Sequence, residues 1–372
     1  MNKIFEKGGK LYWLHSTVDA FETFLHVPGT VTLKGAHVRD AIDLKRLLIL
    51  VVIAAAPAAL FGMWNVGYQH GLAMGQTGVH ILEYFWFGFL KVLPLYIVSY
   101  LVGLGIEFAS SQIRGEEVSE GYLVSGFFIP LIVPVDIPLW MLAVAVAFAV
   151  IFGKEVFGGT GMNIWNPALL TRAFLFFSYP NYMSGSECWI AFKKGETAVA
   201  DAFTGATPLA LDGAPAQYGT GFWDLFIGTV PGSVGETSVI AILLGAILLL
   251  WTGIASWKIM AGSVAGALLV GWIGNIAGIT DIPFYMQLLY GGFAFGTVFM
   301  ATDPVTSCQT ECGKWIFGIL IGMLCITVRL FNPGYAEGMM LAILLLNTFA
   351  PLIDHCVTSV HISRRAKKFN VA

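Results

Sequence analysis

The segment 201–207 reads Asp-Ala-Phe-Thr-Gly-Ala-Thr and combines a carboxylate, two hydroxyls and a small-residue turn. Gly205 and Ala206 leave the backbone open to the close approach of a bulky group. Asp201 could hold a metal-bound nucleotide while a phosphoryl group is transferred to a hydroxyl. The hydroxyl of Thr207 would then carry a flavin nucleotide through a phosphoester bond. The alternative is an ordinary polar turn, because Asp, Thr and Gly are common in loops.

A second polar stretch, residues 153–167, interrupts the apolar pattern with glycines, two asparagines and a proline. A helix cannot run through it unbroken, and in lipid an unwound backbone lines a cavity or contacts a bound polar molecule. Asn163 and Asn166 are three residues apart. On one helical turn they would share a face and could hydrogen bond along the edge of an isoalloxazine ring. The alternative is a surface loop whose asparagines cap helices.

Two acids lie at the ends of apolar segments, Glu107 and Asp354. An ionisable group at membrane depth is costly and by default marks an ion path. Each could equally be an interfacial residue that is solvated by lipid headgroups. A third acid, Asp303, follows Ala301-Thr302 and precedes Pro304, and this pattern predicts a turn or helix cap.

The composition places the chain in a membrane. Of 372 residues, 57% are apolar and 12% are charged, and the mean hydropathy is +0.76, whereas a soluble domain is roughly 25% charged. The net charge of −3 and the absence of a basic stripe argue against nucleic acid as a partner. The first apolar block begins near Leu47 behind both acids and bases, so we expect no cleaved signal peptide. Five scattered cysteines predict neither a disulfide framework nor a metal site.

Ten segments are candidates to cross the roughly 30 Å of hydrocarbon in a bilayer. They cover residues 47–63, 88–108, 120–134, 138–153, 166–180, 237–253, 258–277, 283–301, 315–331 and 335–354. The third, fourth and fifth are short, so we expect tilted or broken helices there. The fold class that follows is an all-α integral membrane protein with about ten transmembrane helices.

Basic residues set the expected orientation. Seven lysines and arginines precede Leu47 and four follow the last span, and the positive-inside rule then places both ends in the cytoplasm. The short loops expected outside carry no basic residue. Each loop expected inside carries one basic residue, and these residues are Arg114, Lys154, Lys258 and Lys314. Under this topology Thr207 lies on the outer face of the membrane.

Five of the expected spans precede the polar segment 181–236 and five follow it. An odd number of spans in each half turns the second half upside down, which is the inverted-repeat plan of many transporters. The expected order is an amphipathic cytoplasmic arm, a first five-helix repeat, an extracytoplasmic loop, a second five-helix repeat and a basic cytoplasmic tail. Their bounds are 1–46, 47–180, 181–236, 237–354 and 355–372.

Motifs along nearly the whole chain resemble the B subunits of the Na+-translocating NADH:quinone reductases. They include residues 8–11, 23–25, 28–29, 37–40, 43–46, 153–167, 172–177, 201–207, 301–304 and 350–355. The D subunits of the Rnf ferredoxin:NAD+ oxidoreductases share the flavin-acceptor motif and remain an alternative. They lack the charged N-terminal arm, so the arm favours the quinone reductase.

The resemblance implies that Thr207 is the phosphoester-linked FMN site. A flavin transferase would recognise the motif through Asp201, Gly205 and Ala206, and Thr204 stands where the family commonly has Ser. A noncovalent riboflavin is implied as well.

For other residues the resemblance also implies roles. Asn163 and Asn166 match positions that contact the riboflavin, and Glu107 and Asp354 match acids implicated in Na+ uptake.

The resemblance further implies a multi-subunit complex in the inner membrane of a bacterium. Electrons from NADH would enter at a partner subunit with FAD and a 2Fe-2S cluster and pass through a second covalent-FMN subunit. They would continue through FMN on Thr207 and riboflavin to quinone, coupled to Na+ export. A rival interpretation of another class is a cofactor-free solute channel of the urea-channel kind, since five-plus-five helices with breaks also suit a channel.

Overall fold

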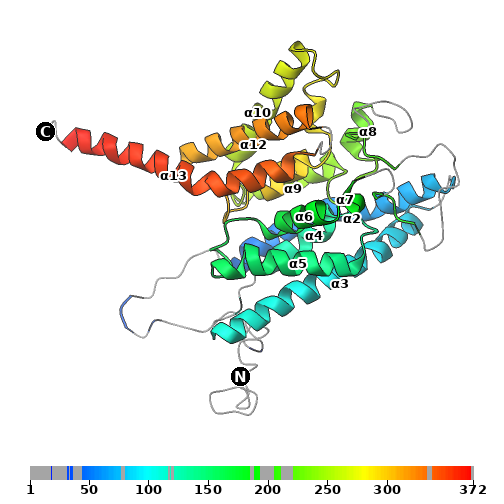
Figure 1. The fold of residues 1–372 in the computed structure, drawn as a ribbon, viewed down its shortest axis with the longest axis horizontal. Coiled ribbons are helices and arrows are strands. Elements are labelled where there is room, and N and C mark those ends of the chain that lie inside the picture. The colour runs from blue at the N-terminus through cyan, green and yellow to red at the C-terminus, as the bar shows by residue number, and fades with distance from the viewer. Residues whose placement is uncertain are drawn as a thin grey trace.

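The computed structural model describes eleven stretches of the chain. They are residues 18, 32, 34–36, 44–76, 80–115, 118, 121–184, 188–192, 205–210, 221–332 and 337–369. Most of the expected N-terminal arm, 1–46, lies outside the described residues, as do Asp201 and Thr204 of the acceptor motif. Throughout the described part the regular structure is helical, and the helices form one bundle from which the C-terminal end of α13 projects (Figure 1).

Six helices are long and apolar enough to cross a membrane. They are α2 (Leu44–Ala73), α3 (Ile81–Arg114), α5 (Leu139–Gly153), α10 (Trp257–Ile276), α12 (Glu311–Phe331) and α13 (Met339–Phe369). Three shorter apolar helices lie among them, namely α4 (Tyr122–Ile132), α6 (Pro167–Ser178) and α9 (Val239–Trp251). Large apolar side chains such as Leu244, Ile247 and Trp272 point outward from the bundle. The chain is therefore a membrane protein whose regular structure, over the residues described above, is all helical.

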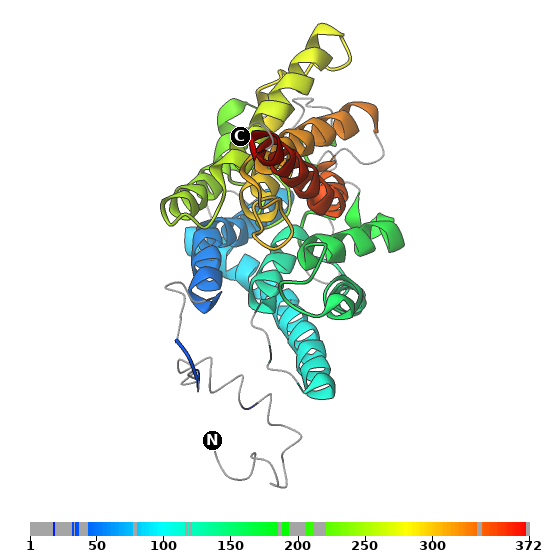
Figure 2. The ribbon, with the colours of Figure 1, turned by 90° about the vertical axis from the view of Figure 1, so that its left-hand side faces the viewer.

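Several short helical segments lie between the longer helices. They are η2 (Glu155–Phe157), α7 (Pro180–Met183), α8 (Phe222–Ile227), η3 (Met286–Leu288), α11 (Phe293–Phe295) and the π-helix η4 (Gly296–Met300). Figure 2 views the bundle from the end to which α13 points and shows α3 and α10 on opposite sides of it.

The expected eighth span, 283–301, is broken into η3, α11 and η4 rather than forming a regular helix. Gly291 allows the break because its φ of +56° is in the left-handed region. The freed carbonyls of Gln287 and Tyr290 accept hydrogen bonds of 2.5 and 2.8 Å from the guanidinium of Arg329 on α12. A buried arginine thus satisfies backbone groups that lipid could not.

The loop before α9 satisfies a free backbone carbonyl at the C-terminal end of the short helix α4. The carbonyl of Leu131 accepts a 2.7 Å hydrogen bond from the N–H of Gly235. On α2, Asn65 donates to the carbonyl of Val230 at 2.9 Å and Gln69 donates to that of Thr229 at 3.1 Å. These bonds tie the loop to helices of the first half of the chain.

Helices α10 and α12 pack backbone against backbone. Each carries a Gly-x-x-x-Gly pattern, Gly262 with Gly266 on α10 and Gly318 with Gly322 on α12. A Cβ atom on Gly266 would overlap the carbonyl of Ile319, and a Cβ atom on Gly322 would overlap that of Ser263. Small residues that permit such contact are a common basis of helix association in membranes.

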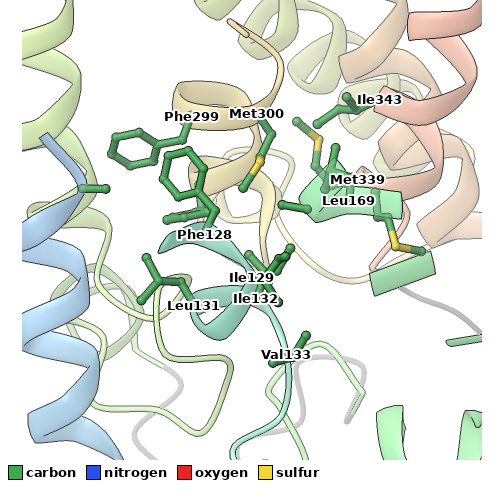
Figure 3. Close-up of a cluster of buried hydrophobic side chains, with 14 of the residues drawn as sticks. Phe128, Ile129, Leu131, Ile132, Val133, Leu169, Phe299, Met300, Met339 and Ile343 are labelled. Carbon is green, nitrogen blue, oxygen red and sulfur yellow. The ribbon is translucent and has the colours of Figure 1, made fainter. Parts of the chain in front are cut away.

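Aromatic and aliphatic side chains fill the centre of the bundle, where α4 and η4 meet (Figure 3). The ring of Phe128 lies 5.8 Å from those of Phe295 and Phe299, edge-on to the first and tilted by 46° to the second. Leu169 of α6 and Ile343 of α13 enter the same cluster. The short helix α4 and the broken segment that contains α11 and η4 are thus held by each other's side chains.

Candidate functional site

Polar loops gather at two separate ends of the bundle. One end holds Thr207 with the loops around residues 230–237 and 289–291. The other end holds the 153–167 stretch and the loop after η4. Helix α9 runs between them, because Thr237 before it belongs to the first site and Leu249 near its end to the second. The helical rise separates these two residues by about 18 Å.

The second end contains a cavity, called here the loop cavity. Its apolar wall includes Leu47, Val51, Phe128, Leu249 and Phe299. Its polar wall includes Lys154, Thr160, Asn163, Asn166, Thr302 and Asp303. The π-helix η4 supplies Phe299, and such local widening of a helix is frequent at functional sites.

Asn166 caps helix α6 and faces the loop cavity. Its Oδ1 accepts from the N–H of Ala168 at 3.0 Å and of Leu169 at 3.4 Å, and Pro167 occupies the first helical position. Its Nδ2 donates to Oδ2 of Asp303 at 3.1 Å. One side chain therefore starts a helix of the first half and bonds to a loop of the second half.

Asn163 reaches the same cavity from irregular backbone. Its Oδ1 accepts from the N–H of Gly161 at 3.3 Å, and its Nδ2 donates to the carbonyl of Trp165 at 3.1 Å. The residues 163–166 are not helical, so Asn163 and Asn166 do not share a helical turn as the spacing suggested. The unwound chain brings them together instead.

Asp303 is half-buried and lines the same cavity. Its carboxylate accepts from Asn166 and, at 3.1 Å each, from the N–H of Val305 and the hydroxyl of Thr306. Burial raises the pKa of Asp303 above its usual value, and these hydrogen bonds oppose the shift. The bond to Val305 is the turn cap that the sequence predicts, but the contact with Asn166 is not visible in the sequence.

Glu107 of α3 forms a buried ion pair with Lys154, and their side chains are 2% and 3% exposed. Its Oε1 carries the bond to Lys154, and its Oε2 is buried without a hydrogen-bond partner in the described part of the chain. From the sequence, Lys154 is expected only as a basic residue of a cytoplasmic loop. The signal that could have found it is a lysine that directly follows an apolar span inside a glycine-rich break.

Asp354 of α13 lies in a different network. It accepts from the N–H groups of Gln309 and Thr310 at 2.7 and 3.0 Å and from the Thr310 hydroxyl at 2.5 Å. Thr310 in turn caps α12. The geometry makes Asp354 an anchor for the start of α12.

At the other end, Thr207 is half-buried at the first position of a turn. Its carbonyl and its Oγ1 accept from the N–H of Ala210 at 2.9 and 3.4 Å. Gly205 and Ala206 before it are buried. A pocket beside Thr207, called here the Thr207 pocket, is lined by Pro208, Gly232, Glu236, Tyr290 and Glu337.

Two acids of the Thr207 pocket are bound by one buried arginine. Arg172 of α6 pairs with Glu236 at 2.5 Å and with Glu337. Burial raises the pKa of Glu236, and the positive charge of Arg172 opposes that shift. The cluster joins α6 to the loops before α9 and α13, so it fixes the floor of the pocket. Sequence reasoning assigned no role to Glu236 or Glu337.

Each site fits the group that the sequence suggests for it. The loop cavity has aromatic and aliphatic walls with a few convergent polar groups, the usual make-up of a cofactor site. The amides of Asn163 and Asn166 each have two N–H bonds, and the contacts above use one of each. Thr207 presents a hydroxyl beside a pocket rather than inside the core. No group of His, Cys, Asp and Glu in the described residues could hold a metal ion.

Known proteins of one family match this chain over most of its length. The family model described as NQR2, RnfD, RnfE matches residues 31–363. The B subunit of the Na(+)-translocating NADH-quinone reductase of Ectopseudomonas mendocina is 45% identical over 97% of this chain and 96% of its own length. The corresponding proteins of Azotobacter vinelandii and Stutzerimonas stutzeri are 44% and 43% identical over the same shares.

Proposed function

The chain belongs to the NQR2, RnfD, RnfE family, and on that basis we propose that it is a membrane flavoprotein subunit of a Na+-translocating NADH:quinone reductase. It would carry covalent FMN on Thr207 and a noncovalent riboflavin in the loop cavity. The observation that supports this most is the placement of an acceptor hydroxyl and an aromatic-walled cavity at opposite ends of α9. The flavins supply electron transfer, and the protein supplies their positions and electrostatic surroundings.

At the Thr207 pocket the protein would hold FMN through a phosphoester. The Thr207 oxygen would bond to the phosphorus of the flavin nucleotide and lose its proton, and the bond from that phosphorus to the non-flavin part of the donor would break and release that part. A flavin transferase that reads the 201–207 motif would perform this step, with Asp201 and Thr204 as part of the recognised sequence. Covalent attachment keeps the nucleotide at an exposed site from which it could otherwise dissociate.

In the loop cavity the protein would hold riboflavin through apolar contact with the ring and hydrogen bonds to one edge. Phe128 and Phe299 offer apolar contact, and the remaining amide N–H bonds of Asn163 and Asn166 offer donors to the ring edge. Asp303 holds Asn166 in place and so fixes the direction of that donor.

Charge supports a cytoplasmic loop cavity and an outer Thr207. The bases near the cavity end include Arg46, Arg114, Lys154, Lys258, Lys314 and the cluster 364–368. At the Thr207 end, Lys91, Arg172 and Arg329 are bound to carboxylates or carbonyls within the protein. By the positive-inside rule, this distribution supports a cytoplasmic position for the cavity end, with the protein in a bacterial inner membrane.

Helix packing supports two inverted five-helix repeats, 47–180 and 237–354. In the first half α3 packs on α5 and α5 on α6, and in the second half α10 packs on α12 and α12 on α13. The third element of each half is the short or broken one, α4 in the first and α11 with η4 in the second. The first helices of the two halves, α2 and α9, contact each other.

Coupling to Na+ would act through this redox path. Moving Na+ outward against a membrane potential of ~100 mV costs about 2.3 kcal/mol per charge. Glu107 and Asp354 are the proposed acids of the ion path. The partner subunits of the complex would hold FAD, a 2Fe-2S cluster and a second covalent FMN. Quinone would be the final acceptor.

The test uses the purified complex after expression with its flavin transferase. On a denaturing gel under ultraviolet light, the band of this chain should fluoresce, and the fluorescence should vanish in Thr207→Ala but persist in Thr204→Ser, which keeps the recognised pattern. A dark wild-type band would favour the solute channel. Na+-stimulated quinone reduction with NADH then separates the quinone reductase from the Rnf-type complex, which would use ferredoxin and NAD+.

A further inference from the structure

Lys154 lines the loop cavity and carries a positive charge that is held within the protein. Its N–H bonds to the carbonyl of Val150 at 3.2 Å, and its carbonyl accepts from Gly159 at 3.1 Å, so the backbone is held where α5 ends. The ammonium is paired with Glu107, and both side chains are almost completely buried. The charge therefore sits beside the cavity with little water to screen it.

Glu107 is the carboxylate that neutralises this charge. The neighbouring acid, Glu155, is engaged elsewhere, since it accepts from the Ser110 hydroxyl at 2.6 Å and lies 3.5 Å from the guanidinium of Arg114. The ring of Tyr122 lies 6.0 Å from the Lys154 ammonium and adds a weak attraction. One oxygen of Glu107 has no hydrogen-bond partner in the described chain, and a buried polar atom of this kind calls for an explanation beyond stability.

We propose that the Lys154–Glu107 pair sets the reduction potential of the flavin in the loop cavity, with Lys154 as the charge that faces the ring and Glu107 as its positioning residue. This inference rests on the proposed function. Reduction adds negative charge to a flavin ring, and charge near the ring is one of the means by which a protein tunes it. In a poorly screened site a cation stabilises that charge much more than it would in water.

The two members of the pair must then shift the reduction potential of the flavin in opposite directions. Lys154 favours added negative charge in the cavity and raises the potential, whereas Glu107 partly cancels Lys154 and lowers it. A pair that only joins α3 to the end of α5 would behave differently. Removing either partner would lower stability and would leave the potential unchanged or shift it the same way in both variants.

The experiment is a redox titration of the intact complex, with dithionite as reductant and the flavin absorbance as signal. Lys154→Met should move the midpoint of the riboflavin step to a more negative potential, and Glu107→Gln should move it to a more positive one. The double variant, in which both charges are gone, should lie between them. Shifts of equal sign, or no shift in either single variant, would overturn the proposal. The midpoints of the covalent flavins serve as an internal reference.

Lys154→Met leaves Glu107 buried and unpaired. If that variant does not assemble, Glu107→Gln, the double variant and Lys154→Arg decide the matter. Lys154→Arg keeps the charge and should keep the midpoint, and Glu107→Gln must still lie above the double variant. The matched control is Lys91→Met, which breaks the 3.1 Å pair with Asp136 at the opposite end of α5 and should leave the midpoint unchanged.

The two proposals fail in different ways. If the wild-type complex contains no extractable riboflavin, the assignment of the loop cavity fails. If riboflavin is present and the midpoints do not follow the charges, only the role of the Lys154–Glu107 pair fails.

Discussion

The amide nitrogen of Asn166 lies 3.1 Å from a carboxylate oxygen of Asp303, which is 137 residues away in the sequence. The bond joins the loop before α6 to the loop after η4, and both residues line the loop cavity. The polar wall of the cavity is therefore complete only when the two halves of the chain are packed together. Folding of the bundle and formation of the site depend on the same contact.

Asn166→Ala should weaken both the fold and the cavity. It removes the N-cap of α6, a loss worth about 1 kcal/mol, and it takes a donor from the half-buried carboxylate of Asp303. We expect a lower melting temperature and loss of riboflavin on purification, with FMN on Thr207 retained. Asn166→Ser is the control, since serine also caps a helix but is too short to reach Asp303. It should recover the stability that the cap contributes without recovering riboflavin, and full riboflavin content in Asn166→Ala would contradict the account.

Gly322→Val should separate α10 from α12. The new side chain would meet the carbonyl of Ser263, and overpacking of this kind costs about 1–3 kcal/mol. Thermal unfolding of the detergent-solubilised protein measures the effect. Gly105→Val is the matched control, because a Cβ atom on Gly105 of α3 meets no atom within 4 Å. Equal stability of the two variants would show that the close contact between α10 and α12 is not formed.

Thiol labelling should report on the orientation of the bundle. Cys312 and Cys356 are exposed and lie toward the cavity end, so a membrane-impermeant maleimide should label them only from the cytoplasmic side. Burial, aided by the charge of Asp354, raises the pKa of Cys308 to about 12. At pH 8 its thiolate fraction is then about 10⁻⁴, and it should stay unlabelled until the pH is raised or the protein unfolds. Labelling of Cys312 from the outer side alone would reverse the proposed topology.

Hydropathy predicts the long helices well because each must present apolar side chains to lipid over its whole length. The same signal fails at 283–301, where the residues are apolar but the chain is broken. What permits the break is Arg329, some forty positions later, whose guanidinium binds the free carbonyls. A sequence window does not contain that partner.

The candidate site shows the same division. The asparagines of the 153–167 stretch can be identified because a polar break in an apolar chain is a local signal. That Asn166 meets Asp303, and that Glu107 meets Lys154, depends on how distant helices pack. The Arg172 cluster under Thr207 likewise unites three segments. Pairings of this kind come only from the folded structure.

Mass spectrometry of the peptide that contains Thr207, prepared from the fully matured complex, tests the central claim most directly. The account predicts that this peptide carries the added mass of an FMN phosphoester located on Thr207, and that the added mass is absent from Thr207→Ala. An unmodified Thr207 peptide from the mature complex would contradict it.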